Sequence, residues 1–217
     1  YYYNRAIVQG DQLIPSNLND EIQSVGGQYT YQKNKWNGKF SYSTSITDQS
    51  LSNLDGKLIF NYNEKNSIDL RYQNLNRLPN HTFSLFQSSY VNYNWVNNFK
   101  NEKINNIEVT AKTQWIDAAL QLTTLNDYLY FSQDEAPQDQ LLVTPKQYDQ
   151  TINYLSIKAG KDLKFWKLGF DNTVLYQKVD QQNDILNVPE LTLRSTLYFT
   201  GHFFKKALFL QTGVTVN

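Results

Sequence analysis

The chain has 217 residues, and its 20 lysines and arginines equal its 20 aspartates and glutamates. A net charge of zero argues against a polybasic nucleic-acid binder, so we expect no nucleic-acid partner. The absence of cysteine excludes disulfide frameworks, cysteine-ligated zinc and cysteine nucleophiles. No run approaches the roughly 20 apolar residues of a membrane-spanning helix. A membrane β-barrel stays possible, because its strands are apolar on one side only.

Alternation of apolar and polar residues with a period of two predicts an all-β chain. In Trp36–Ile46, for example, Phe40 and Tyr42 fall on one side of the strand, and Lys39 and Ser41 fall on the other. No segment shows a helical stripe. The eleven predicted strands are Tyr1–Gln9, Ile22–Gln32, Trp36–Ile46, Leu54–Tyr62, Ser67–Gln73, Ile104–Thr113, Ala118–Asn126, Thr151–Lys161, Phe165–Lys178, Leu191–Phe199 and Leu208–Val216.

The predicted connections alternate between short and long. The short ones are Lys33–Lys35, Asn63–Asn66, Gln114–Asp117, Asp162–Lys164 and Gly201–Lys206. The long ones are Gly10–Glu21, Thr47–Asn53, Asn74–Lys103, Asp127–Gln150 and Val179–Glu190. An antiparallel meander with short turns at one end and long loops at the other is the layout of a bacterial outer-membrane β-barrel.

The number of predicted strands suggests that other strands complete the barrel. Single-chain bacterial barrels have an even number of strands, whereas eleven is odd. Strand-like runs also begin at Tyr1 and end at Asn217. Unpaired strand edges are not tolerated in lipid, because each unpaired backbone group costs several kcal/mol there. We therefore expect one domain, residues 1–217, that forms a segment of a larger transmembrane barrel.

Aromatic residues gather beside the predicted short turns. Such rings favour the headgroup level of a membrane, where they form a girdle. The predicted girdle comprises Tyr29, Tyr31, Trp36, Tyr62, Trp115, Trp166 and Phe199. Near the long loops, a second girdle is expected from Tyr72, Tyr128, Tyr130 and Tyr176.

Charged residues of both signs alternate with the apolar side of the predicted strands. On a barrel they would face the lumen, because a lysine or arginine facing lipid at the midplane costs about 2–4 kcal/mol. Two roles remain open for them: lining a wet channel, or pairing across strands to support a packed interior. The predicted lumen-facing residues are Lys39, Lys57, Asp69, Arg71, Glu108, Lys112, Lys158, Lys167, Asp171 and Arg194.

We predict no catalytic residue, metal site or cofactor. The two histidines, His81 in a long loop and His202 in a short turn, should lie at opposite ends of the barrel. His81 has Ser84 and Asp69 near it in sequence, but a polar loop histidine is the simpler interpretation. Loop carboxylates suit Ca²⁺, yet the spacing of Asp134, Glu135 and Asp139 matches no EF-hand, which favours a solvated loop.

Three stretches carry a resemblance to a known family. NRLPNHTFSLFQSSYVNYNWVNNFKNEKINNIEV, TTLNDYLYF and the final LRSTLYFTGHFFKKALFLQTGVTVN resemble the putative porins of Bacteroidetes outer membranes, in the late part of the barrel. The resemblance implies a barrel of roughly 14 or more strands and no catalytic residues. The middle stretch is similar, more loosely, to TonB-dependent transporters, in which elements like Arg77–Asn80 and Phe99–Lys103 flank an extracellular loop.

These patterns favour a porin-like outer-membrane protein that lets small polar solutes pass and has no enzymatic activity. Its partners would be outer-membrane lipid and, through the long loops, other outer-membrane proteins. One alternative is a structural or binding subunit of a larger complex, with Tyr90, Tyr93 and Trp95 as an exposed interface in Asn74–Lys103. A TonB-dependent transporter and a soluble sugar-binding β-sandwich are the others.

Four side chains separate the barrel from the sandwich. Phe40, Leu58, Leu70 and Leu193 fall on the apolar sides of their predicted strands. A sandwich would bury them between two sheets. A barrel would leave them exposed on its outer surface.

Overall fold

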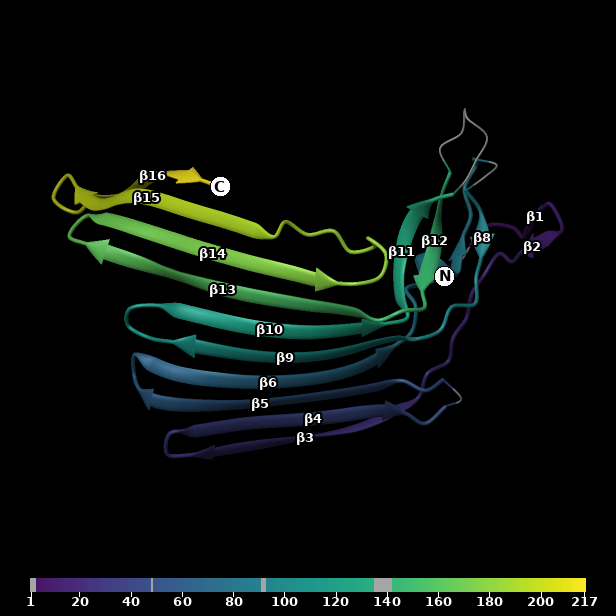
Figure 1. Cartoon of the computed structure of the whole chain (residues 1–217), viewed down its shortest axis with the longest axis horizontal. Coiled ribbons are helices and arrows are strands. Elements are labelled where there is room, and N and C mark those ends of the chain that lie inside the picture. Colours follow the sequence, from purple (N-terminus) through teal and green to yellow (C-terminus); the bar gives the residue numbers. More distant parts are fainter. Residues whose placement is uncertain (1–2, 48, 91–92, 135–141) are drawn as a thin grey trace.

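The computed structural model describes residues 3–47, 49–90, 93–134 and 142–217. Its main element is one antiparallel sheet of ten strands, which lie side by side in chain order (Figure 1). The strands are β3 (Ser24–Lys33), β4 (Trp36–Ser45), β5 (Ser52–Asn63), β6 (Asn66–Arg77), β9 (Glu102–Lys112), β10 (Asp117–Asn126), β13 (Ile152–Phe165), β14 (Leu168–Asp180), β15 (Leu191–Phe203) and β16 (Leu208–Val216). The sheet is open, because β3 and β16 each pair on one side only.

Ten of the eleven predicted strands are confirmed, and the first is wrong. In the described part of the segment predicted as Tyr1–Gln9, residues 3–9, the one strand is Ile7–Gln9, which forms β1 of a small hairpin with β2 (Gln12–Ile14). Gly10 makes the turn between them with φ +58°, a backbone conformation that glycine adopts without strain. The hairpin lies outside the ten-stranded sheet, which therefore has an even number of strands.

Short and long connections lie at opposite ends of the sheet, as predicted. The short ones, at the left of Figure 1, are residues 34–35, 64–65, 113–116, 166–167 and 204–207. Two predicted turns are misplaced. Asp162–Lys164 lies inside β13, because Leu163 and Phe165 continue its apolar side and pair with Phe170 and Leu168. The last turn begins after Phe203, which places His202 in β15 rather than in a turn.

Strand register sorts the side chains onto two faces of the sheet, because directly paired residues share a face. One row of partners runs Leu58, Leu70, Val109, Leu120, Ile157 and Tyr176 across six strands. We call this side the apolar face and the other the polar face. Phe40, Leu58, Leu70 and Leu193 lie on the apolar face and are 41–52% exposed. No second layer in the described part of the chain covers them, so the sandwich prediction is wrong.

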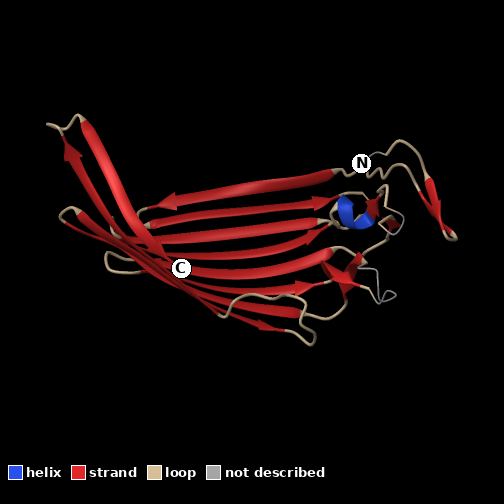
Figure 2. Ribbon diagram, turned by 90° about the horizontal axis from the view of Figure 1, so that it is seen from above, coloured by secondary structure: helices blue, strands red, loops and turns tan. Residues whose placement is uncertain are grey.

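The polar face is the more enclosed of the two. Asn106, Ser156, Ile152 and Tyr198 belong to it and are buried, although two of them are polar. The sheet is strongly curved (Figure 2). Side chains converge on the concave side of a curved sheet and spread on the convex side, so the burial identifies the polar face as the concave one.

The long connections form a separate cluster at the end of the sheet opposite the short turns (Figure 1). This loop cluster consists of α1 (His81–Ser84), β7 (Leu85–Phe86), β8 (Trp95–Val96), β11 (Tyr128–Gln133) and β12 (Val143–Tyr148). Leu85, Trp95 and Leu129 are its buried centre. No helix in the described residues is long and apolar enough to cross a membrane.

Glu102 fastens the loop cluster to the sheet. Its carboxylate is buried at the start of β9 and accepts a hydrogen bond from Nε of Arg77, at the end of β6, over 3.0 Å. The other carboxylate oxygen accepts the backbone N–H of Leu129 in β11 over 3.2 Å. One side chain thus joins three strands, two from the sheet and one from the cluster.

Candidate functional site: the polar face

Nine of the ten charged residues predicted for the lumen lie together on the polar face. The row Lys39, Lys57, Arg71 and Glu108 runs directly across β4, β5, β6 and β9. The remaining five follow from register on the same face: Asp69, Lys112, Lys158, Asp171 and Arg194. Whether this face borders a lumen stays a prediction.

Lys167 is the exception, because it lies in the turn between β13 and β14. Its Nζ is 5.2 Å from the ring centroid of Trp166 and 6.0 Å from that of Phe199, which belongs to the apolar face. The prediction for Lys167 is wrong because the preceding strand runs on to Phe165. A cation over an aromatic ring is attracted by the negative ring face.

The charges on β5 and β6 neutralise one another. Lys57 and Arg71 are direct cross-strand partners, a juxtaposition of like charges that is destabilising by itself. Arg71 donates to Oδ2 of Asp55 from Nη2 over 2.6 Å and from Nε over 2.9 Å. The ammonium of Lys57 lies 3.3 Å from Oδ2 of Asp69. These diagonal contacts turn the row into two ion pairs, and Asp55 is a member that we did not predict.

The charges on β9, β13 and β14 remain uncommitted. Lys112, Lys158 and Asp171 are exposed, and none forms an ion pair within the described residues. Glu108 accepts only a long hydrogen bond of 3.4 Å from the hydroxyl of Thr110. All four line one hollow of about 470 Å³ on the polar face.

Small residues form the floor of this hollow. Ala119 and Gly160 lie between the charged residues, on β10 and β13. A Cβ on Gly160 would stand only 2.5 Å from the backbone oxygen of Asn172 in β14, so a larger residue does not fit without movement of the strands. The close approach of β13 and β14 therefore requires a residue without a side chain at position 160, which leaves the hollow open there.

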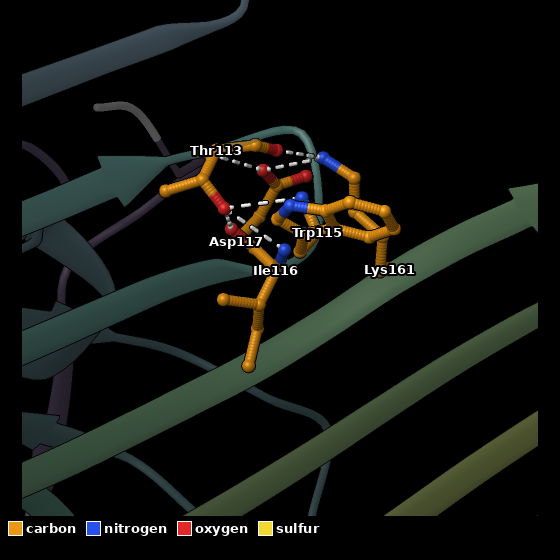
Figure 3. Close-up of polar contacts among 5 residues, drawn as sticks. All are labelled: Thr113, Trp115, Ile116, Asp117 and Lys161. Atoms are coloured by element: carbon orange, nitrogen blue, oxygen red, sulfur yellow. Dashed lines mark hydrogen bonds and ion pairs between the residues drawn. The ribbon is translucent and has the colours of Figure 1, made fainter.

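Two residues that line the hollow, Asp117 and Lys161, also take part in a hydrogen-bonded turn at the short-turn end, whose contacts Figure 3 shows. Lys161 reaches from β13 to the β9–β10 turn, where its Nζ donates to the backbone oxygen of Thr113 and lies 2.9 Å from Oδ1 of Asp117. The hydroxyl of Thr113 donates to the backbone oxygen of Ile116 over 2.7 Å and accepts the N–H of Trp115 over 3.2 Å. Lys161 and Asp117 therefore satisfy each other and the turn.

Tyr198 and Asp162 form a second hydrogen-bonded contact at the edge of the hollow. The hydroxyl of Tyr198 donates to the carboxylate of Asp162, with O···O distances of 2.7 and 2.9 Å. The ring of Tyr198 occupies the space that a side chain on Gly169 would fill. Lys164 lies 3.4 Å from the same carboxylate. Asp162 is thus engaged, unlike Asp171 opposite it.

A family model described as "Putative porin" matches residues 1–217. The chain belongs to this porin family. No curated protein matches the chain. Membership accords with a channel role rather than catalysis, and with an all-β chain whose polar face carries charges of both signs.

The aromatic residues predicted for the first girdle lie at the short-turn end of this porin-family sheet. Six are on the apolar face or in turns and are well exposed: Tyr29, Tyr31, Trp36, Tyr62, Trp115 and Trp166. Phe199 lies on the same face, opposite Leu168. Phe165 and Phe204 are also highly exposed there, and we did not predict them. Their membrane position stays a prediction.

Two of the four tyrosines predicted for the second girdle lie on the ten-stranded sheet. Tyr176 lies on the apolar face opposite Leu191, at the long-loop end, and Tyr72 lies on the same face opposite Gly56. Tyr128 and Tyr130 are in β11, outside the ten-stranded sheet. Their assignment to a girdle on this sheet is wrong, because part of their long connection folds into a hairpin of its own.

Trp95 is buried, so it does not belong to the exposed surface of the predicted loop interface. Its ring stacks on Phe86 with centroids 4.8 Å apart, and its indole N–H donates to the backbone oxygen of Thr82 over 3.0 Å. The prediction that Trp95 is exposed is therefore wrong. Tyr90 is 73% exposed, and its ring meets that of Tyr93 edge-on at 6.5 Å.

Each histidine has a contact of its own within the described residues. His81 lies 3.4 Å from the carboxylate of Asp20, while Asp69 is engaged by Lys57. The His202 ring contacts that of Phe209, at 5.0 Å between centroids.

Asp134 is the one described residue of the calcium hypothesis, and other side chains already contact it. Asp134 is 2.7 Å from the ammonium of Lys146, and the hydroxyl of Thr144 also donates to it. These contacts lower the pKa of Asp134 below its usual value, with the hydrogen bond from Lys146 as the largest cause. Glu135 and Asp139 lie outside the described residues. Among the described residues, no group of three potential ligands could hold a metal ion.

Proposed function

We propose that this chain forms part of the wall of an outer-membrane β-barrel through which small polar solutes pass. One observation carries the proposal: a single curved sheet of a porin-family chain has an exposed apolar convex face and a charged concave face. A water-soluble protein would bury such an apolar face against a second layer. Acyl chains are the partner that suits it here.

The distribution of charge supports the same orientation. Near the middle of the strands, the apolar face presents Leu70, Val109 and Ile157, while the neighbouring positions on the polar face hold Arg71, Glu108 and Lys158. Facing lipid at the midplane would cost about 2–4 kcal/mol for each arginine or lysine. The polar face would therefore border water, as the lumen of a channel does.

Both edges of the sheet would need partners in this setting. Strands β3 and β16 are exposed along their whole length. Each unpaired N–H or C=O costs several kcal/mol in hydrocarbon. We propose that further strands complete the ring, and that the ten described strands are a continuous part of it.

Conductance of the full-length protein in a planar lipid bilayer tests transport directly. We expect stable steps that grow with salt concentration. An assembled protein without conductance above background would contradict the proposal.

Single-cysteine labelling tests the orientation separately, because the chain has no cysteine of its own. Val109→Cys and Thr110→Cys place a thiol on adjacent residues of β9 that point to opposite faces. In membranes, we expect a membrane-impermeant maleimide to label Thr110→Cys and to spare Val109→Cys. The reverse pattern would contradict the assignment of the faces, and the wild type measures background labelling.

A structural or binding role in a larger outer-membrane complex is the second candidate. It would use the loop cluster as the contact surface, where Tyr90 is the most exposed of the three predicted aromatic residues. The burial of Trp95 weakens it relative to transport. Copurification of a stoichiometric partner from detergent extracts would favour it.

A further inference from the structure

The polar face contains two kinds of charge, one paired and one free. On β5 and β6, Arg71 and Lys57 are neutralised by Asp55 and Asp69 within 3.3 Å. These groups stabilise the sheet and have little capacity left for a passing solute. Around the hollow on β9, β10, β13 and β14 the situation is different, because four of the charges there form no ion pair within the described residues.

Four uncommitted charges surround the hollow, two of each sign. Lys112 and Lys158 supply the positive charges, and Glu108 and Asp171 supply the negative ones. The other charges that line it already have partners of opposite sign, since Asp117 is paired with Lys161 and Asp162 with Lys164. The free charges therefore sum to zero while presenting separate positive and negative groups.

The positions of these groups keep them apart. Glu108 and Lys158 lie two strands apart, because β10 runs between β9 and β13. With neighbouring strands about 4.8 Å apart, their backbones are roughly 10 Å distant across the sheet. Ala119 of β10 lies between these two strands, and Gly160 follows Lys158 along β13, so small residues leave the space open. Long side chains can reach into this space from both sides without cancelling each other.

We propose that this hollow is a transient binding site for small zwitterionic solutes, such as an amino acid or a dipeptide. The solute's ammonium group would be held by Glu108 or Asp171, and its carboxylate by Lys158 or Lys112. An ion of one sign meets as much repulsion as attraction here, whereas a molecule carrying both charges satisfies both sets. The inference rests on the proposed channel function and names its substrate class.

Exposed ion pairs contribute little, which suits a channel. Each contact in high dielectric is worth about 0.2–1 kcal/mol. A site that holds its solute weakly both recruits it and releases it. Tight binding would block passage.

Liposome swelling with the full-length protein tests the inference. The probes are glycylglycine, which is zwitterionic, and N-acetylglycinamide, which is uncharged and of similar size. The measured quantity is the ratio of their entry rates. We expect the Lys158→Gln/Asp171→Asn double variant to lower this ratio about threefold, as the loss of weak exposed contacts predicts. Lys39→Gln is the control for removing a charge elsewhere, because Lys39 lies on the same face outside the hollow and forms no ion pair within the described residues.

The outcomes separate this inference from the channel proposal. Entry of both probes with the same ratio in wild type and double variant would overturn the zwitterion site and leave the channel intact. An equal fall of the ratio in Lys39→Gln would also overturn it, because the effect would then belong to the whole face. If neither probe enters wild-type vesicles, the channel proposal fails and the site fails with it. Circular dichroism checks that each variant keeps its β-structure.

Discussion

Leucine and tryptophan side chains are buried in the loop cluster of this molecule but exposed on its sheet and turns. In the loop cluster, Leu85 is fully buried and Trp95 nearly so. On the apolar face of the sheet, Leu70 remains about half exposed, and Trp166 in a turn is 83% exposed. Large apolar side chains are thus covered in one region of the chain and exposed in the other. The difference accords with the proposal that the cluster faces water and that the apolar face of the sheet faces acyl chains.

Trp95→Ala should produce the largest effect. Truncating a buried aromatic residue costs about 3–5 kcal/mol, because it removes packing and leaves a cavity. We expect the loop cluster to lose protection in hydrogen exchange while β9 and β10 keep theirs. Equal loss of protection in the sheet would show that the two regions are not independent.

Leu70→Lys should have the next largest effect, and it tests the sheet instead of the loop cluster. On a lipid-facing surface at mid-strand the substitution costs about 2–4 kcal/mol, whereas on a water-facing surface it is close to neutral. We expect a lower midpoint of urea unfolding in lipid vesicles. Gln73→Lys, on the polar face of the same strand, is the control and should shift the midpoint little.

Glu102→Gln should loosen the joint between the two regions. The variant loses the charge-assisted hydrogen bonds from Arg77 but keeps an acceptor for the N–H of Leu129. We expect a loss of about 1–2 kcal/mol, seen as faster proteolysis of the loop cluster with the sheet intact. Unchanged cleavage would mean that other contacts hold the cluster in place.

The smallest expected effect is a pH dependence confined to the β11–β12 hairpin. The contacts with Lys146 and Thr144 lower the pKa of Asp134 from its ordinary value of 3.8. A carboxylate whose folded pKa is lowered stabilises the fold above its unfolded pKa, and this contribution disappears as pH falls through the folded pKa. We expect the protection factors of the hairpin in hydrogen exchange, corrected for the intrinsic pH dependence, to fall below about pH 4 in the wild type. Asp134→Asn should remove this dependence.

The sequence was sufficient for the ten strands of the sheet and for the faces of most of their residues, because period two needs only local information. Phe40, Leu58 and Leu193 could be assigned to one side from their own segments. Pairing between charges was beyond reach, since the contact of Arg71 with Asp55 depends on the register between two strands. The register is set by the turn at residues 64–65, whose geometry the residue pattern does not reveal.

The burial of loop residues was equally hidden from the sequence. Trp95 is covered because β7, β8 and β11 meet in space, and β11 is far from the other two in the chain. The misplaced turn at Asp162–Lys164 has a different cause. The charged residues Asp162 and Lys164 are typical of a turn. In the structure they continue the polar face of a long strand.

The chain-order arrangement of the ten strands has a consequence for how such a wall changes size. Each strand pairs only with the strands that precede and follow it in the sheet, so any hairpin can be removed or duplicated without rerouting the rest. The new neighbours would meet with the same antiparallel geometry and the same two faces. Widening or narrowing in steps of two strands is therefore an available evolutionary route for this architecture, with no redesign of the strands that remain.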